Sequence, residues 1–179
     1  GPIAYSLYPS RPTGSSRRTN RRLQPPQPLM LPGALRIRMA STSFDTGVDG
    51  EAVEGILSAA RTSLGDTLRS VVYFTPSAFD VLYTRRDLHD SADEVTAAMS
   101  RLVEFERTGF AEGPVRTRIA GADEDSGIGP YEFTVRFHED GFVVRVIQGD
   151  AGVLLTADAM DVDAFEDAAV AIRGLLAGT

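Results

Sequence analysis

The group of side chains best suited to chemistry lies near the middle of the chain. It combines an aromatic, two basic and one imidazole group within a short stretch, namely Tyr83, Arg85, Arg86 and His89. Arginine binds carboxylates and phosphates through paired hydrogen bonds, so this cluster could hold an anionic ligand or the acidic side chains of a partner. A small-ligand or anion sensor, or an enzyme using these residues, is therefore one candidate function. In the alternative interpretation the arginines pair within the chain, with Asp87 and Asp90.

No other residues have the spacing that a catalytic or metal site requires. His89 and His138 are the two histidines, and neither belongs to an H-E-x-x-H pattern. The sequence has no cysteine and no G-x-S-x-G segment, so it offers no thiolate and no evident nucleophile. The acidic run at 123–127 lacks the later glutamate of a calcium loop and is interpreted as hydrated surface. We expect no catalytic residue, no metal and no cofactor, and the sequence leans against an enzyme.

Charge is divided unevenly along the chain. Residues 1–38 contain seven arginines and no acid, whereas the other 141 residues contain eleven arginines and 25 acids, a net charge of −14. The chain contains no lysine. Molar salt screens the mutual repulsion of acidic side chains, so this composition is typical of a cytoplasmic protein of a halophile. High genomic GC content would also replace lysine by arginine, but it does not explain the excess of acids.

Hydrophobic patterns predict the first elements of an acidic α+β domain over residues 40–179. An amphipathic helix is expected to begin after Asp49 and to end at Gly65. The stretch 68–75 is rich in β-branched and aromatic residues and predicts a strand. The stretch 79–85 is interpreted as a second strand in a hairpin with the first, and a short helix beginning at Ser77 is the alternative.

The next elements are a second helix and a long connection. Ser91 and Glu94 have the spacing of a capping box, and the helix that they open should turn Phe105 inward among its apolar residues. Residues 110–130 are expected to be irregular, with a short edge strand at 115–120.

Three strands and a last helix are expected to complete the domain. Residues 131–157 alternate as strands joined by two tight turns, the first at Gly141. A clean apolar stripe then predicts a helix that begins after Asp158 or Asp161.

The three predicted strands are apolar on both sides. If they are regular, Val143, Ile147 and Leu154 point away from the face that holds Phe142 and Val144. A sheet that is apolar on both faces must cover both, either with helices or with a second copy of the chain. We therefore expect Val143, Ile147 and Leu154 to be interface residues of a homodimer, although helices could cover them instead.

The order helix, two strands, helix, three strands, helix resembles that of roadblock, longin-like and profilin-like domains. This resemblance implies an antiparallel sheet of about five strands flanked by three helices, and a dimeric scaffold or regulator of small GTPases. Separately, the segments SVVYFTPSAFDVLYTRRDL and FVVRVIQGDAGVLLTADAM resemble small acidic proteins of haloarchaea. We expect a non-enzymatic interaction or regulatory adaptor that self-associates in the cytoplasm, with a possible further protein partner.

Residues 1–39 differ from the rest in composition. Proline, serine, glycine and arginine dominate there, and such a segment buries too little apolar surface to offset the entropy of ordering, so we expect disorder. The segment is interpreted as a mis-assigned start, an inert or targeting tail, or a basic arm. Nucleic acid is not an expected partner, because such binding weakens steeply with salt. No apolar run is long enough to span a membrane.

The start-site interpretation gives a direct prediction. Met39 and Ala40 stand where the acidic domain begins, so mass spectrometry of the native protein should find an N-terminus at one of these two residues. A mature chain that retains Arg17 and Arg18 would contradict this prediction and would restore the basic arm as a candidate.

Overall fold

The structure is a computed structural model that describes residues 34–35, 43–121, 131–159 and 161–178. The chain divides into two units, residues 1–30 and 31–179, and every described residue belongs to the second unit. The expected disorder of residues 1–39 therefore falls mostly outside the described residues. Within that segment, Ala34–Leu35 form a two-residue strand, β1, which pairs with residues 84 and 85.

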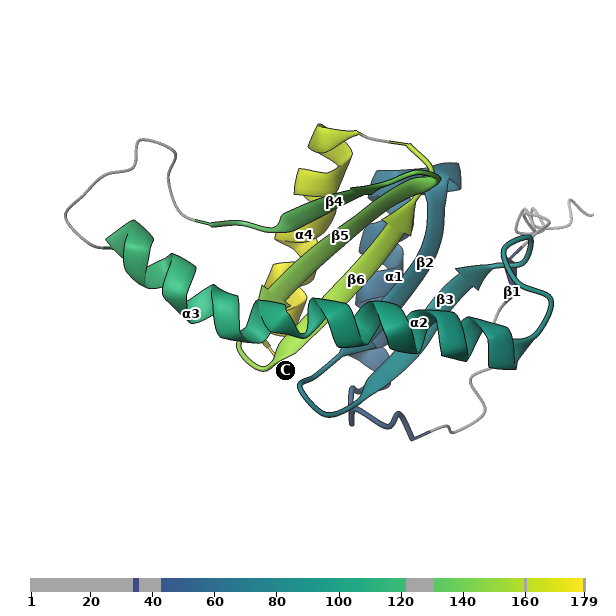
Figure 1. The fold of residues 1–179 in the computed structure, drawn as a ribbon, viewed down its shortest axis with the longest axis horizontal. Helices are drawn as coiled ribbons and strands as arrows, with labels where there is room; N and C mark the ends of the chain where they lie inside the picture. Colours follow the sequence, from purple (N-terminus) through teal and green to yellow (C-terminus); the bar gives the residue numbers. More distant parts are fainter. Residues whose placement is uncertain (1–33, 36–42, 122–130, 160, 179) are drawn as a thin grey trace, which may run out of the picture. The chain divides into compact units, whose positions relative to one another are not determined.

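One antiparallel sheet of six strands organises the described residues (Figure 1). Its strands lie in the order β1-β3-β2-β6-β5-β4. After β1 the strands are β2 (Leu68–Phe74), β3 (Phe79–Arg85), β4 (Thr134–His138), β5 (Gly141–Gln148) and β6 (Ala151–Ala157). The helices are α1 (Gly50–Leu64), α2 (Ala92–Glu106), α3 (Thr108–Gly121) and α4 (Val162–Leu176), with a 3-10 turn η1 at Gly65–Thr67. The predicted α+β class and element order are confirmed, and β1 and α3 are additional elements.

Residues 75–85 form a tight turn followed by strand β3, which makes a hairpin with β2. The Thr75 hydroxyl accepts a hydrogen bond from the Ala78 N–H at 3.0 Å, and the Thr75 N–H donates to the Ala78 carbonyl at 2.9 Å. These bonds close a tight turn around Ser77. Residues 79–85 then pair with β2 as a strand, so the alternative of a helix beginning at Ser77 is wrong.

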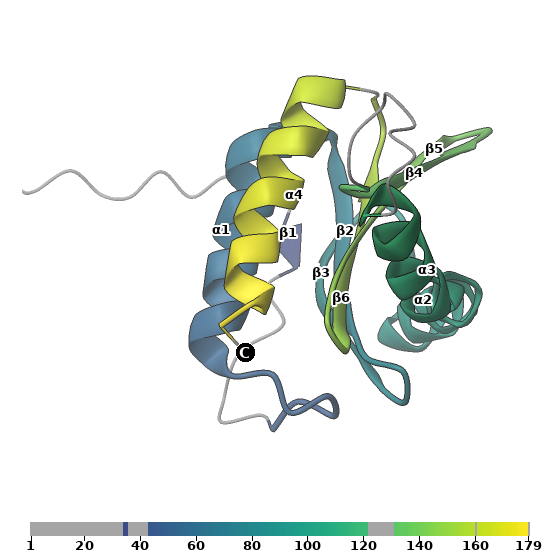
Figure 2. The same ribbon diagram turned by 90° about the vertical axis from the view of Figure 1, so that its left-hand side faces the viewer.

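Helices α1 and α4 cover one face of the sheet and lie side by side (Figure 2). Each begins at an aspartate: the Asp49 carboxylate accepts from the Ala52 N–H at 2.8 Å, and the Asp161 carboxylate from the Ala164 N–H at 3.0 Å. These caps satisfy backbone donors that the first helical turn leaves unpaired. The core beneath includes Ile56, Ala60, Val71, Val144, Val153, Leu155, Phe165, Ala168 and Ile172.

Helix α2, followed directly by α3, covers the opposite face (Figure 2). The Ser91 hydroxyl accepts from the Glu94 N–H at 3.2 Å, which confirms the predicted cap. The Glu94 carboxylate accepts from the Asp90 N–H at 3.1 Å, one residue before the position of a standard capping box. A second core forms here from Val72, Phe74, Val95, Met99, Val103, Val143 and Leu154.

The three residues expected at a dimer interface belong to this second core. Val143 and Leu154 are buried, and Ile147 packs against them half-buried. Of the two ways to cover this face, the structure uses helices of the same chain. A second copy could reach Val143, Ile147 and Leu154 only if α2 moved away from the sheet.

Over residues 110–121, helix α3 replaces the predicted irregular connection and edge strand, and the rest of that connection, residues 122–130, lies outside the described residues. Pro114 lies inside the helix, where proline removes a backbone hydrogen bond and costs about 3 kcal/mol, so the local sequence indicates a break. Contacts with the sheet favour the helix instead. Phe110 packs into the second core, and the Glu112 carboxylate accepts a hydrogen bond from Arg145 of β5 at 2.7 Å.

The prediction that Phe105 faces inward is wrong. The buried line of α2 runs through Val95, Met99, Val103 and Glu106, and Phe105 lies beside this line with 67% of its surface exposed. A buried charged residue therefore takes the inward position that an aromatic residue was predicted to fill.

Candidate functional site

The residues of the predicted ligand cluster have separate surroundings. The ring of Tyr83 is half-buried against the first helix layer, which is formed by α1 and α4, and the guanidinium of Arg61 lies over it, 5.1 Å from the ring centroid. Arg85 ends β3, Arg86 is exposed in the turn that follows, and His89 is half-buried in the loop before α2. A ligand site at these four residues stays a prediction.

Arg85 is paired within the chain, in agreement with the alternative interpretation. Its guanidinium donates to the Asp87 carboxylate at 2.7 Å and to the Asp158 carboxylate, which also accepts from Arg69 at 2.7 Å. Hydrogen bonds from Arg85 lower the pKa of Asp87 and of Asp158, and the bonds to Asp87 and then Asp158 raise the pKa of Arg85. Asp158 thus links the residues after β6 to β2 and β3. The guanidinium of Arg85 is already paired with two carboxylates, so it is less available to an external anion.

A network of buried charges lies under the junction of α2 and α3. Arg145 of β5 and Glu106 of α2 each have 1% of their side chain exposed. Arg145 donates to the Glu106 carboxylate at 3.0 Å, to Glu112 at 2.7 Å and to the Thr134 hydroxyl at 3.2 Å. Arg136 of β4 donates to the other carboxylate oxygen of Glu106 at 2.6 Å. Two arginines and two glutamates therefore balance one another and join α2, α3, β4 and β5.

Arg145 and Glu112 of this network are held in their charged forms. Burial lowers the pKa of Arg145, but hydrogen bonds with Glu112 and Tyr131 outweigh burial, so its pKa is raised. The hydrogen bond from Arg145 lowers the pKa of Glu112. The Arg145 Nε has no hydrogen-bond partner among the described residues. Loss of one partner would leave an unbalanced buried charge, which typically costs about 3–5 kcal/mol.

This network was not predicted from the sequence, although two signals were present. Arg145 interrupts the apolar run of β5, and Glu106 falls in the buried line of α2. Arginine and glutamate are almost never fully buried unless they are paired, so each position indicated a partner. The identity of the partner depended on the fold, because the two residues are distant in sequence.

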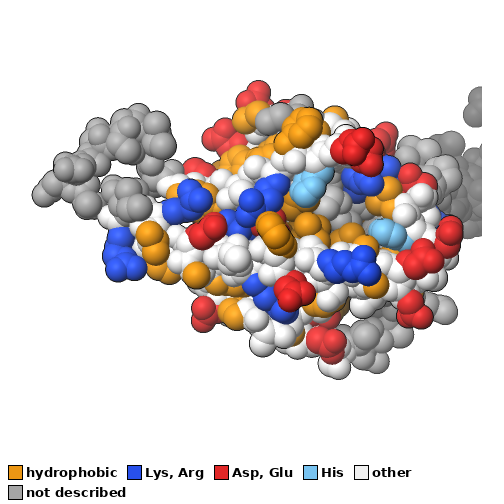
Figure 3. Space-filling view, viewed as in Figure 1, with side chains coloured by type: hydrophobic (Ala, Val, Ile, Leu, Met, Phe, Trp, Pro, Cys, Tyr) orange, Lys and Arg blue, Asp and Glu red, His pale blue; other side chains and the backbone are white. Residues whose placement is uncertain are grey.

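Strand β4 forms one edge of the sheet and pairs only with β5 among the described strands. On one face of β4, Phe137 is 77% exposed and contacts Phe142 edge-on, with ring centroids 5.0 Å apart. On the other face, the Arg136 guanidinium lies 5.6 Å from the ring centroid of Phe105, which is also exposed. Arginine and apolar side chains lie beside one another on the surface of this α2–α3 side (Figure 3). Two exposed phenylalanines therefore flank one open strand.

The described residues were searched for metal-binding groups and for helices that could span a membrane. None of their groups of three or more histidine or acidic side chains could hold a metal ion, and the acidic run at 123–127 lies outside the described residues. None of the described helices is long and apolar enough to cross a membrane.

The fold defines an α+β domain in which helices cover both faces of one antiparallel sheet. Residues 54–177 match the family described as "Domain of unknown function (DUF7522)", and the chain belongs to this family. Among solved structures, the gliding protein mglB from Thermus thermophilus is similar at 12% sequence identity. The similarity covers 77% of this chain and 100% of that chain, with a TM-score of 0.49. No curated protein matches the chain.

The close packing of Arg145 against α3 gives a testable prediction at Gly109. A Cβ at this position would lie 2.5 Å from the Ile147 side chain and 2.6 Å from the guanidinium of Arg145. Gly109→Ala should therefore lower the free energy of unfolding, measured by denaturant titration, by about 1–3 kcal/mol.

Gly113→Ala is the matched control in the same helix, because a Cβ there meets nothing within 4 Å. Alanine favours a helix over glycine, so this change should be neutral or stabilise the domain by up to about 1 kcal/mol. Equal losses for the two variants would contradict the packing of Arg145 against α3.

Proposed function

We propose that the chain is a non-enzymatic interaction and regulatory adaptor domain that works as a homodimer in a salt-rich cytoplasm. The observation that carries this proposal is the edge of β4 that no other described strand pairs with, which has an exposed phenylalanine on each side. An unpaired edge strand is a template for a strand of another chain, and proteins normally shield such edges. The element order supports the same proposal, because roadblock and longin-like domains act as dimeric scaffolds or regulators.

The rest of the sheet offers fewer sites for association. Helices α1 and α4 cover one face and α2 covers the other, and β1 pairs along part of β3 at the opposite edge. Exposed phenylalanine is costly in water, and salt strengthens the hydrophobic effect. Association through β4 would bury Phe137 and Phe105 at the point where the sheet is unpaired.

An antiparallel pair of β4 strands centred on Val135 would be self-complementary. Phe133 of each copy would lie opposite Phe137 of the other, which gives aromatic cross-strand pairs of about 0.2–1 kcal/mol each. Thr134 would lie opposite Arg136, so no like charges would face each other at these positions. The two-fold axis would pass beside Val135, which makes the interface closed and limits the assembly to a dimer.

The absence of cysteine allows a sharp test of this register. A single introduced cysteine can pair only with its own copy. Val135→Cys should give a covalent dimer on mild oxidation in molar KCl, because opposed residues in antiparallel strands have Cβ atoms about 4.5–5.5 Å apart. Non-reducing electrophoresis and light scattering would measure the dimer.

His138→Cys is the control, since its two copies would lie about 20 Å apart along the strands. Equal cross-linking of His138→Cys and Val135→Cys would indicate random collisions. A purely monomeric parent chain in molar KCl, with no covalent dimer from Val135→Cys, would contradict the proposed dimer.

The proposed salt-rich setting predicts that salt stabilises the domain. Raising KCl from about 0.1 M to about 1 M shortens the Debye length from about 10 Å to about 3 Å, so repulsion among the acids weakens. The thermal midpoint of residues 40–179, followed by circular dichroism, should therefore rise with KCl. A midpoint that falls or does not change over this range would contradict the halophilic assignment.

A further inference from the structure

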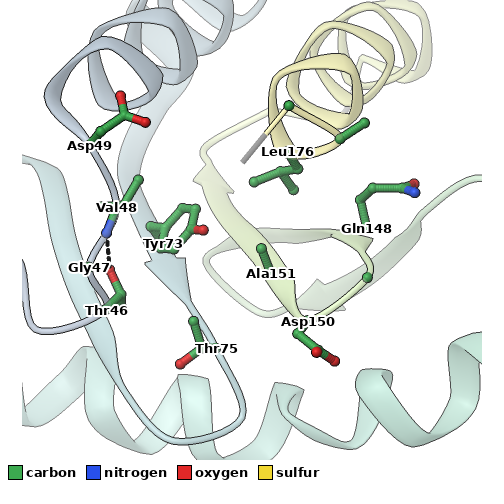
Figure 4. A pocket seen from close by; sticks show the side chains of 13 residues that line it. Thr46, Gly47, Val48, Asp49, Tyr73, Thr75, Gln148, Asp150, Ala151 and Leu176 are labelled. Atoms are coloured by element: carbon green, nitrogen blue, oxygen red, sulfur yellow. Dashed lines mark hydrogen bonds between the residues drawn. The ribbon is translucent and has the colours of Figure 1, made fainter.

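A hollow of about 580 Å³ opens at the end of the first helix layer (Figure 4). It is lined by the loop before α1 (46–49), by Tyr73 and Thr75, by the β5–β6 turn (148–151) and by the end of α4 (176–178). Its volume lies in the range of about 300–1,000 Å³ that is typical of small-ligand sites. None of these residues belongs to β4 or α2, so the hollow is separate from the proposed dimer edge.

Small residues and a fixed loop keep the hollow open. Gly47 and Gly149 have φ angles of +77° and +59°, and a Cβ at either would meet nothing within 4 Å. Ala151 is the first residue of β6 and fills little of the space. The loop before α1 is held by Asp80, whose carboxylate accepts from the Thr46 N–H at 2.9 Å and from the Thr46 hydroxyl. The space is therefore part of the folded structure of the domain.

Tyr73 places a polar group inside this hollow. Its side chain belongs to the first core and the residue is 4% exposed, while its hydroxyl points toward the space between Leu176 and Ala151 (Figure 4). No hydrogen bond joins this hydroxyl to another described residue. The hydroxyl is not among the buried side-chain atoms that lack a partner in the described residues, so it is accessible to solvent, and the side chains of Val48 and Leu176 beside it are apolar. The arrangement suits a ligand with an apolar body and one polar group.

The charges around the hollow select the polar group. Asp49 and Asp150 lie on opposite sides of it, and the lining contains neither arginine nor histidine (Figure 4). The negative end of the α4 dipole and the positive end of the α1 dipole both lie at the hollow, so the helix dipoles favour neither sign of charge. The two acidic side chains disfavour nucleotides, phosphates and carboxylic acids. We propose that the hollow binds a small organic amine whose ammonium group donates to the Tyr73 hydroxyl oxygen near Asp150.

Three probes of similar shape and different charge test this site: benzylamine, benzyl alcohol and benzoate. Each probe is added to the isotope-labelled full chain at a KCl concentration at which the amide NMR spectrum shows a folded chain. The probe concentration is raised to about 10 mM, well above a millimolar dissociation constant. Benzylamine should shift the signals of Tyr73, Gly149 and Ala151 in a saturable way. Benzyl alcohol should bind more weakly, and benzoate should leave these signals unchanged.

Variants then assign the effect to the hollow. Ala151→Leu should fill the space and abolish the shifts. Tyr73→Phe should weaken the binding of benzylamine, and this variant serves as the test if Ala151→Leu does not fold. Asp150→Asn should weaken benzylamine by about threefold, in keeping with a partly exposed charge pair, and should leave benzyl alcohol unaffected. Asp163→Asn is the control, because this exposed acid of α4 lies outside the lining.

Several outcomes would overturn the inference. These are equal binding of benzoate, no saturable shift with benzylamine on a folded spectrum, or equal losses for the Asp150 and Asp163 variants. Each of these results is independent of the oligomeric state, so this site can fail while the proposed dimer holds, and the reverse is also true.

Discussion

Strands β2, β5 and β6 are apolar on both sides, and this property dictates the layers of the domain. Successive residues alternate between the two cores, such as Val71 and Val72, Val143 and Val144, or Leu154 and Leu155. Burial of a side chain of this size contributes about 1.5–3 kcal/mol, so a bare face would forfeit several such contributions. Helices of the same chain cover both faces, which leaves the ends and edges of the sheet for other contacts.

The two layers differ in how they are fastened. The first contains no buried charged residue among the described residues, and its helices are capped by aspartates. The second contains the buried pair Arg145 and Glu106, which fixes the end of α2 and the start of α3 against β5 and, through Arg136, against β4. Apolar packing would often stabilise such a site at least as well, but removal of one partner of the pair would leave an uncompensated buried charge. The network joins α2, α3 and β5 to β4, the edge strand on which the proposed dimer depends.

The sequence predicted the elements whose causes are local. Asp49, Ser91 and Asp161 cap their helices through residues three positions away, and alternation within the last three strands is visible in the sequence itself. Helix α3 and the exposure of Phe105 could not be predicted in this way, because both depend on contacts between α2, α3 and β5. The hollow beside Tyr73 was equally hidden, since four segments distant in sequence form it.

Amide hydrogen exchange of the folded chain, measured at two protein concentrations, tests most directly whether one chain covers both sheet faces and leaves β4 as its open edge. We predict slow exchange throughout β2, β5 and β6 at both concentrations. We also predict that β4 exchanges more slowly at the higher concentration, because a second copy pairs with it. Fast exchange in β5 at low concentration, or exchange in β4 that does not depend on concentration, would contradict this description.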